Sequence, residues 1–445
     1  MKILCVSLGC DKNLVDTEKM LGLLLKDGYE FTDDEQEAEI IVINTCAFIN
    51  DAKEESVNTI LEMARLKETG HLKVLLVAGC LAQRYQEEIL QEIPEVDGIL
   101  GTTSYDAIGK VLEEALDGKT DQAFRSIDET PEVHTERVLT TGGHYAFLKI
   151  AEGCNKHCTY CIIPSLRGRY RSVPMEELLS EAENLASRGV KELILVAQET
   201  TLYGVDLYGR KMLPELLHRL CRIDGLQWIR VQYCYPEEIT DELIDTIAAE
   251  EKICHYLDIP IQHASDRILK AMGRRTSQME LRERIAAMRA KIPDLAIRTT
   301  LISGFPGETE EDHEELYNFV DEMEFERLGV FAYSCEENTP ASLFPDQVPE
   351  EEKARRRDEI MELQQEIAFE KSEAMIGRVL EVMIEGRMPE EDTYVGRTYM
   401  DAPNVDGFIF INTHLDLMSG TFAKVLVTGS SEYDLIGELY DESAE

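Results

Sequence analysis

Short apolar runs alternate with helical patterns over the first 116 residues. The apolar runs are "KILCVSL", "EIIVINT", "VLLVAG" and "DGIL", each of a length suited to one strand. Between them, apolar residues recur at helical spacing over 13–28, 51–68 and 81–93. Strand–helix alternation at this pace predicts a parallel α/β sheet over 1–116. The polar stretch 117–143 has little periodicity, and we expect it to be a linker.

The remaining chain shows two further patterns. Residues 144–348 repeat a strand–helix unit six times, with the strands "FLKIA", "ELILVAQ", "WIRVQ", "YLDIP", "IRTTLIS" and "RLGVFAY". Six βα units would make most of a TIM-like barrel, which closes with eight. A highly charged segment, 349–376, predicts a connector helix with a solvated face. Five short alternating strands over 377–445 predict a small antiparallel β-barrel. The predicted class is therefore α/β with a C-terminal barrel.

Composition limits the setting of the protein. A chain of 445 residues exceeds one ordinary core. No apolar run approaches ~18 residues, so we expect no membrane contact. The start "MKILCVSLGC" lacks the apolar region and cleavage site of a signal peptide, which favours the cytoplasm. Disulfides are rare there, so eleven cysteines indicate metal or redox chemistry. The net charge of −42 repels nucleic acid and favours a basic partner.

Three cysteines follow successive predicted strands in the first domain. Cys10, Cys46 and Cys80 end "SLGC", "INTC" and "VAGC". The carboxyl ends of parallel strands lie along one edge of a sheet, so we expect these thiols to converge there. The alternative is three buried small hydrophobic side chains. The cysteines outside any motif are expected in the core; these are Cys5, Cys221, Cys234, Cys254 and Cys335.

A second group of cysteines follows the first predicted barrel strand, in "GCNKHCTYC". Cys154, Cys158 and Cys161 are one ligand short of a tetrahedral zinc site. His157 is the nearest fourth ligand, but four ligands within eight residues would strain a tetrahedron. An iron–sulfur cluster held by three thiolates leaves one iron open. The spacing therefore indicates a cluster whose open iron contacts a substrate or cofactor.

The spacing CxxxCxxC, with Tyr160 before the last cysteine, resembles the radical S-adenosylmethionine (SAM) superfamily. With the first cysteine group and the C-terminal barrel, the chain resembles the methylthiotransferase family, which ends in a TRAM barrel. The segments "SLGCDKNLVDTE", "YAFLKIAEGCNKHCTYCIIPSLRGRYRS", "LVAQETTLYG" and "LISGFPGETEED" resemble the branch that modifies ribosomal small-subunit protein twelve. Asp11 departs from the Pro common in that branch, and Val173 from the common Arg.

The resemblance implies that a methylthio group replaces a hydrogen on the β-carbon of an aspartate. It implies two 4Fe–4S clusters, one on each cysteine group, two SAM molecules per turnover and a one-electron donor resembling flavodoxin or ferredoxin. It also implies further SAM contacts: Gln198 and Glu199 at the amino group, Arg298 at the carboxylate and Tyr160 near the adenine. Each of these four could equally have a structural role. The "GFPGE" stretch, 304–308, predicts a tight turn near a ligand.

Three alternatives remain open from the sequence. The same chemistry could act on a tRNA adenosine, the chain could be an iron–sulfur electron-transfer protein without radical chemistry, or the C-terminal barrel could be a generic nucleic-acid module. Residues 377–445 carry four basic and fourteen acidic residues, a net charge of −10. That charge opposes RNA and steers a basic protein inward. We expect this barrel to dock protein twelve, free or in the assembled small subunit, without direct tRNA binding. Candidate contacts are Glu390, Glu391 and Asp392, which could equally form a solvated turn.

Overall fold

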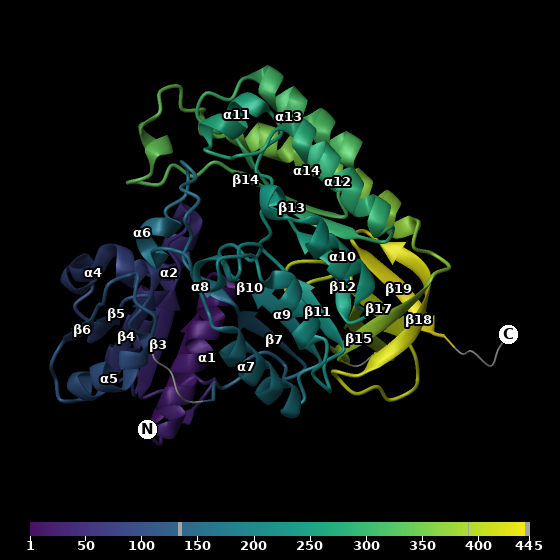
Figure 1. Ribbon diagram of the computed structural model, residues 1–445. Coiled ribbons are helices and arrows are strands. Elements are labelled where there is room, and N and C mark those ends of the chain that lie inside the picture. The colour runs from purple at the N-terminus through teal and green to yellow at the C-terminus, as the bar shows by residue number, and fades with distance from the viewer. Residues whose placement is uncertain (132–135, 390, 441–445) are drawn as a thin grey trace. The chain divides into compact units, whose positions relative to one another are not determined.

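The computed structural model describes residues 1–131, 136–389 and 391–440 (Figure 1). The chain forms two compact units, and both draw on segments that are separated in the sequence. The first comprises Met1–Thr140, Ala151–Arg171 and Ser334–Ser342; the second comprises Thr141–Ile150, Ser172–Tyr333 and Leu343–Glu445. The units therefore do not coincide with the linear domains suggested by the sequence.

The first unit contains a six-stranded parallel sheet. Its order is β2–β1–β3–β4–β5–β6, with bounds β1 (Lys2–Ser7), β2 (Glu30–Phe31), β3 (Ile40–Thr45), β4 (Val74–Gly79), β5 (Gly98–Leu100) and β6 (Asp121–Ala123). The four predicted strands are present. The prediction missed the edge strands β2 and β6, which have only two and three residues, as edge strands often do. Strand β6 lies inside the stretch expected to be a linker, so that expectation was wrong for 121–123.

Helices cover both faces of this sheet. They are α1 (Asp11–Lys26), α2 (Asn50–Ala64), α3 (Leu66–Thr69), α4 (Cys80–Glu92), η1 (Tyr105–Ala107) and α5 (Ile108–Leu116). Ile40 and Val42 of β3 share a buried cluster with α1 and α5, whereas Ile41 and Ile43 share one with α2 and α4. Alternate residues of a strand point to opposite faces, so a continuous apolar run is what a doubly covered strand requires.

The second unit contains six parallel strands in the order β14–β13–β12–β11–β10–β7. Their bounds are β7 (Tyr145–Lys149), β10 (Glu192–Val196), β11 (Trp228–Val231), β12 (Ile253–Asp258), β13 (Ala296–Ser303) and β14 (Arg327–Ala332). The associated helices are α7 (Met175–Ser187), α8 (Val205–Tyr208), α9 (Leu213–Leu220), η2 (Pro236–Glu238), α10 (Asp241–Ala249), α11 (Asp266–Ala271), α12 (Gln278–Lys291) and α13 (Glu310–Met323). The predicted partial barrel of six βα units is confirmed.

The long helix α14 (Glu350–Glu373) was expected to be a connector with a solvated charged face. It instead packs on β14, β13 and α13 and buries an apolar stripe that includes Ile360 and Ile367. Lys353 and Arg356 are also buried. The lysine ammonium Nζ donates a hydrogen bond to the Tyr333 carbonyl oxygen at 3.0 Å. The expectation was therefore wrong for these two charges, which have specific partners within the unit.

The C-terminal barrel is closed, in the order β15–β16–β17–β19–β18. Its strands are β15 (Val379–Arg387), β16 (Thr393–Arg397), β17 (Ile409–Asn412), β18 (Phe422–Ser431) and β19 (Asp434–Leu439). All five strands were predicted. Four pairings are antiparallel and β17–β19 is parallel, because an odd number of strands cannot alternate all the way round. Its core continues into Trp228 and Tyr256 of the six-stranded sheet.

Candidate active site

Three neighbouring strands of the first unit lead into the first cysteine group. Cys10 is the N-cap residue of α1, Cys80 is the first residue of α4, and Cys46 directly follows β3. Two of the thiols thus lie at helix N-termini, where the helix dipole favours the thiolate. The Cys46 amide donates to Ser56 Oγ on α2 at 3.0 Å, which fixes the third strand end.

Glycines let the strand ends approach one another. Gly9 and Gly79 precede Cys10 and Cys80 and have φ angles of +87° and +91°. A Cβ on Gly9 would lie 2.6 Å from Cys46 Cβ, and one on Gly79 would lie 2.2 Å from Asn44 Oδ1. No larger residue fits either position without displacing its neighbour. The recurring Gly–Cys dipeptide was a sequence signal for this geometry that the prediction did not use.

The electrostatics of this group follow from burial and mutual proximity. Burial raises the pKa of Cys46 to about 12, and the charges of Cys80 and Cys10 add to that shift. Burial also raises the pKa of Cys80, which the nearby Arg167 guanidinium opposes. Buried thiols that interact in this way need a cation to become thiolates together. A soft three-thiolate donor set fits an iron–sulfur cluster.

The second cysteine group lies in a loop between β8 (Ala151–Glu152) and β9 (Arg171–Ser172), followed by α6 (Ile163–Arg167). The Cys161 amide donates to the Cys158 carbonyl oxygen at 3.0 Å, and the Lys156 amide lies 3.5 Å from Cys154 Sγ. Gly153 has a φ of +81°, and a Cβ there would lie 2.1 Å from the Arg169 oxygen. The loop is thus held by backbone contacts at its start and around Cys158, and a backbone donor faces the Cys154 sulfur, as suits a thiolate.

This loop packs with the first unit, although the sequence placed it in the barrel domain. Ile162 and Leu166 join the buried cluster formed with α4 and the strands β3 and β4. Thr102 Oγ1 donates to the Leu166 carbonyl oxygen at 2.7 Å. Both cysteine groups therefore belong to one compact unit. The sequence did not predict that the two groups share a unit, because the contacts that join them are between residues more than sixty positions apart.

Polar side chains gather where the strands of the second unit end. Glu199 follows β10, is fully buried and accepts a hydrogen bond from Thr201; Gln198 beside it is half-buried. Gln232 Oε1 and Ser303 Oγ, after β11 and at the end of β13, are buried without a hydrogen-bond partner among the described residues. Buried polar atoms require partners, so this end of the sheet fits a polar ligand such as SAM. The sequence prediction did not include Gln232 or Ser303.

The other two predicted SAM contacts lie elsewhere. Tyr160 is a half-buried residue of the cysteine loop. Arg298 is the third residue of β13, and its Nη1 lies 3.0 Å from Asp258 Oδ1 while its Nε lies 3.4 Å from Asp406 Oδ1. The guanidinium is therefore engaged by two carboxylates of its own unit. Its contact with the SAM carboxylate stays a prediction, as do the contacts of Gln198, Glu199 and Tyr160.

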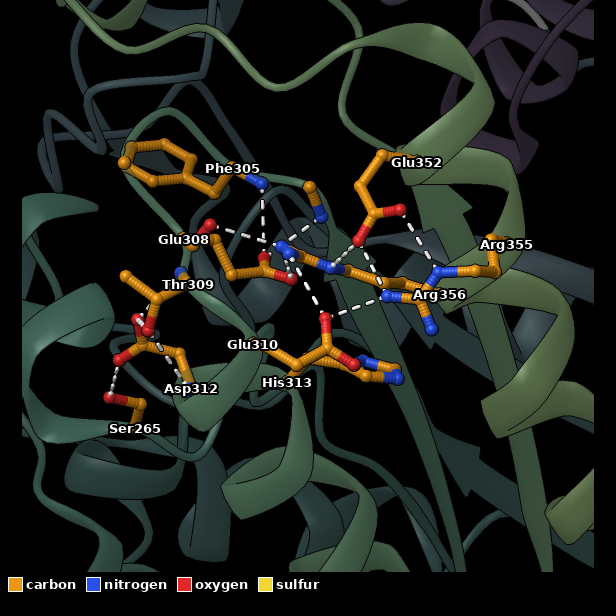
Figure 2. Close-up of polar contacts among 12 residues, drawn as sticks. Ser265, Phe305, Glu308, Thr309, Glu310, Asp312, His313, Glu352, Arg355 and Arg356 are labelled. Atoms are coloured by element: carbon orange, nitrogen blue, oxygen red, sulfur yellow. Dashed lines mark hydrogen bonds and ion pairs between the residues drawn. The ribbon is translucent and has the colours of Figure 1, made fainter.

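The "GFPGE" stretch forms the tight turn that was predicted, directly after β13 (Figure 2). Glu308 Oε2 accepts hydrogen bonds from the Gly304 and Phe305 amides at 2.8 and 3.1 Å. Arg356 of α14 donates to Glu308 Oε1 at 3.0 Å. A Cβ on Gly304 would lie 2.3 Å from Lys353 Cγ, so the glycine allows α14 to pack closely. The turn is thereby locked to the helix behind it.

The cysteines outside the two groups are mostly in the core, as expected. Cys221, Cys234 and Cys254 are buried and Cys5 is half-buried. Cys335 is exposed, so its core assignment was wrong. The adjacent Glu336 takes the buried position instead, because it pairs with Lys53 at 2.9 Å and Arg84 at 2.8 Å within the first unit.

Comparison with known proteins agrees with this architecture. Residues 2–101 match the uncharacterized protein family UPF0004, residues 148–320 match the radical SAM superfamily, and residues 376–439 match the TRAM domain. The fold and the thiol groups thus define a radical SAM protein with a C-terminal TRAM barrel. No helix among the described residues is long and apolar enough to cross a membrane.

Curated relatives cover essentially the whole chain. It is 65% identical over 437 residues to the ribosomal protein uS12 methylthiotransferase RimO of Lachnoclostridium phytofermentans, covering 98% of this chain and 99% of the relative. It is 51% identical over 451 residues to RimO of Acetivibrio thermocellus, covering 100% and 99%. The chain belongs to the uS12 methylthiotransferase family RimO. It is therefore an enzyme of the transferase class.

Solved structures share the fold at low sequence identity. The radical SAM methyltransferase TsrM from Kitasatospora setae, with cobalamin and a [4Fe-4S] cluster bound, has a TM-score of 0.56 at 13% identity and covers 77% of each chain. The cobalamin-dependent radical enzyme OxsB has a TM-score of 0.52 at 15% identity, covering 81% of this chain and 56% of that one. At this identity the likeness establishes the fold alone.

Proposed function

We propose that this chain adds a methylthio group to the β-carbon of an aspartate in ribosomal protein uS12. The observation that carries the proposal is the 65% sequence identity, over 98% of this chain, to a uS12 methylthiotransferase. The two groups of three cysteines support it. The β C–H bond is unactivated, and no side-chain base removes its hydrogen at neutral pH. Cofactor radical chemistry is therefore required.

Six thiols would hold the metal. Two 4Fe–4S clusters are proposed, one on Cys154, Cys158 and Cys161 and the other on Cys10, Cys46 and Cys80. Cys154, Cys158 and Cys161 would hold the cluster that, with SAM bound, would supply the carbon radical for hydrogen abstraction from the aspartate. In the other group, Cys10 and Cys80 lie at helix N-termini, a setting suited to holding the sulfur that a first SAM molecule would methylate. A flavodoxin-like or ferredoxin-like protein would provide the electrons.

The acidic C-terminal barrel would receive the substrate. Of its four basic residues, Arg397 is buried and therefore unavailable to phosphates. Arg387 is 2.8 Å from Asp392 Oδ1, and His414 is 2.8 Å from the other oxygen of that carboxylate. Glu391 is exposed, and Glu390 lies outside the described residues. This surface fits a basic protein, uS12 free or in the small subunit, better than a tRNA. A cytoplasmic location follows from that substrate and stays a prediction.

An exposed loop between β17 and β18 adds apolar contact area to this surface. Leu415 and Met418 are 65% and 73% exposed, and the Asp416 side chain between them is 99% exposed. Large apolar side chains this exposed, beside acidic ones, suit a cationic protein segment whose aliphatic stems can cover them. The loop is thus a candidate contact for uS12.

The direct test is product analysis. Reconstituted, reduced protein is incubated with SAM and with free uS12, small subunits or a tRNA anticodon stem-loop, and peptides and nucleosides are analysed by mass spectrometry. We expect a methylthio group on one aspartate of uS12. Modification of the tRNA alone, or 5′-deoxyadenosine formation without any modified substrate, would refute the proposal.

Two cysteine variants separate the roles of the two groups. C154A/C158A/C161A should lose half of the bound iron and all reductive cleavage of SAM. C10A/C46A/C80A should also lose half of the iron, but it should keep cleavage and make no methylthio product. Full iron in either variant would contradict the assignment of two clusters.

A further inference from the structure

Arg167 reaches from the segment of the second cysteine group to a thiol of the first. It is the last residue of α6, six positions after Cys161, and its side chain is 2% exposed. Its Nη2 lies 3.5 Å from Cys80 Sγ. Both residues belong to the first unit. The guanidinium is therefore a buried cation in contact with a proposed cluster ligand.

The other contacts of Arg167 fix its orientation. Its Nη1 lies 2.8 Å from Asp16 Oδ2 and 3.2 Å from Glu152 Oε2, and its Nη2 also donates to Asn13. The planar fork of a guanidinium divides its donors between two sides in this way. One side faces the carboxylates, and the other faces the thiol.

Asn13 extends the network to the remaining strand ends. Its Nδ2 donates to the Leu8 carbonyl oxygen at 3.0 Å and to the Thr45 carbonyl oxygen at 2.9 Å. Leu8 lies two residues before Cys10, and Thr45 lies directly before Cys46. A single Arg–Asn pair therefore connects the backbones at two cysteine sites with the sulfur of the third.

We propose that Arg167 is a positioning residue for the cluster held by Cys10, Cys46 and Cys80, and that it sets the reduction potential of this cluster; the inference rests on the proposed function. Hydrogen bonds to ligand sulfurs and nearby charge are established controls of cluster potential. A reduced cluster carries one more negative charge than an oxidised one. A cation at the ligand sulfur stabilises the reduced form and raises the potential, and the carboxylate of Glu152 moderates this effect.

The position of Arg167 in the chain couples the two cysteine groups. It lies in the stretch that also holds Cys154, Cys158 and Cys161, so correct folding of that loop also delivers the charge to the other thiol group. The cluster on Cys10, Cys46 and Cys80 would then reach its working reduction potential only when the loop with Cys154, Cys158 and Cys161 is correctly folded. No assigned ligand of either cluster performs this role.

The experiment isolates one cluster in the full-length chain. The C154A/C158A/C161A protein is reconstituted without oxygen, its iron is counted, and its remaining cluster is titrated potentiometrically with detection by electron paramagnetic resonance. R167Q is added to this variant and should lower the reduction potential of the remaining cluster. We expect at least a tenfold change in the reduction equilibrium, which is about 59 mV for a one-electron couple. R167K keeps the positive charge but lacks the planar guanidinium. Its reduction potential should lie between those of the parent variant and R167Q.

Two further variants make the test specific. E152Q removes a carboxylate from Arg167 and should shift the potential in the opposite direction, upward. R169Q removes an arginine from the same loop whose side chain is 84% exposed, and it should leave the potential unchanged. Opposite shifts from two side chains in contact are the signature of electrostatic tuning, which a merely structural role does not produce.

Each outcome decides a different point. If the C154A/C158A/C161A protein binds no iron, the proposed cluster on Cys10, Cys46 and Cys80 is wrong, and so is the inference about Arg167. If the parent and R167Q both hold the cluster at the same potential, the role of Arg167 is refuted while the proposed function stands. If R167Q cannot retain its cluster, E152Q decides: a raised potential supports the inference, and an unchanged one overturns it.

Discussion

Arg397 of β16 and Glu192 of β10 form a buried ion pair, in which Arg397 Nη2 lies 2.8 Å from Glu192 Oε2. The other carboxylate oxygen, Oε1, accepts a hydrogen bond from Arg230 Nε of β11 at 2.7 Å. All three side chains are at most 1% exposed. The C-terminal barrel is thus joined to the six-stranded sheet by buried charges and by a shared apolar core. A substrate docked on that barrel, as proposed, would therefore have a defined position relative to the sheet.

Replacing Glu192 by Gln should be strongly destabilising. The change leaves Arg230 and Arg397 buried without their shared counter-charge, which typically costs about 3–5 kcal/mol. The free energy of unfolding is measured by urea denaturation of the full-length protein, from the transition of the second unit. The matched control is D392N, which removes an exposed partner of Arg387 and should cost about 1 kcal/mol or less. Equal effects of the two substitutions would contradict the argument.

Asp312 should contribute stability that acid removes. It accepts hydrogen bonds from Ser265 Oγ at 2.7 Å and the Thr309 amide at 2.8 Å (Figure 2). It also pairs with Arg267. Burial acts to raise its pKa, but these hydrogen bonds outweigh burial and lower the pKa from 3.8 to about 2. A folded-state pKa below the unfolded value gives stability that is complete above the unfolded pKa and is lost as pH falls through the folded one.

The difference in unfolding free energy between wild type and D312N should therefore be constant from neutral pH down to about pH 4 and should shrink between 3.8 and about 2. Denaturation of both proteins across this pH range checks it. Because all other carboxylates titrate in both proteins, they cancel in the difference. A difference that persists unchanged at the lowest pH would rule out a charged Asp312 as its source.

Gly79→Ala should damage the first cysteine group selectively. The substitution places a Cβ 2.2 Å from Asn44 Oδ1 at a φ of +91°, so the strand end before Cys80 must move. We expect bound iron to fall toward half while reductive cleavage of SAM continues. Gly118→Ala is the control: its φ is +77° but nothing lies within 4 Å of the added atom. That control carries only the backbone cost of about 1–2 kcal/mol and should keep its iron. Full iron in G79A would refute the packing argument.

Binding of uS12 should depend on the charge of the C-terminal barrel. Affinity should fall as salt rises, because exposed charges are screened over about 8–10 Å at physiological ionic strength. D416K should weaken binding roughly fivefold, about 1 kcal/mol, since Asp416 is fully open to a partner. D117K, the same change at an exposed aspartate of the first unit, is the control. Calorimetry with uS12 and with a tRNA stem-loop across a salt series is the measurement. Tight, salt-sensitive binding to the tRNA alone would reverse the assignment of the partner.

The sequence determined the elements and the metal-binding cysteine candidates. Strands buried on both faces are dominated by apolar residues, so β3, β4 and β10 are visible as runs. The cysteines follow those runs directly, and the spacing of Cys154, Cys158 and Cys161 is a local property of the chain. Edge strands as short as β2 and β6, with two and three residues, are too short to show such a pattern.

Only the tertiary structure decided which charges are buried and with whom. Arg167 and Cys80 are 87 positions apart, and Arg397 and Glu192 are 205 apart. A charged residue has the same identity whether it faces water or a buried partner, so the periodicity of the sequence cannot distinguish the two. For this reason the buried charges of α14 were misjudged, and the role of Arg298 stays a prediction. The free energy of burying a charge depends on the partner, and the partner is supplied by the fold.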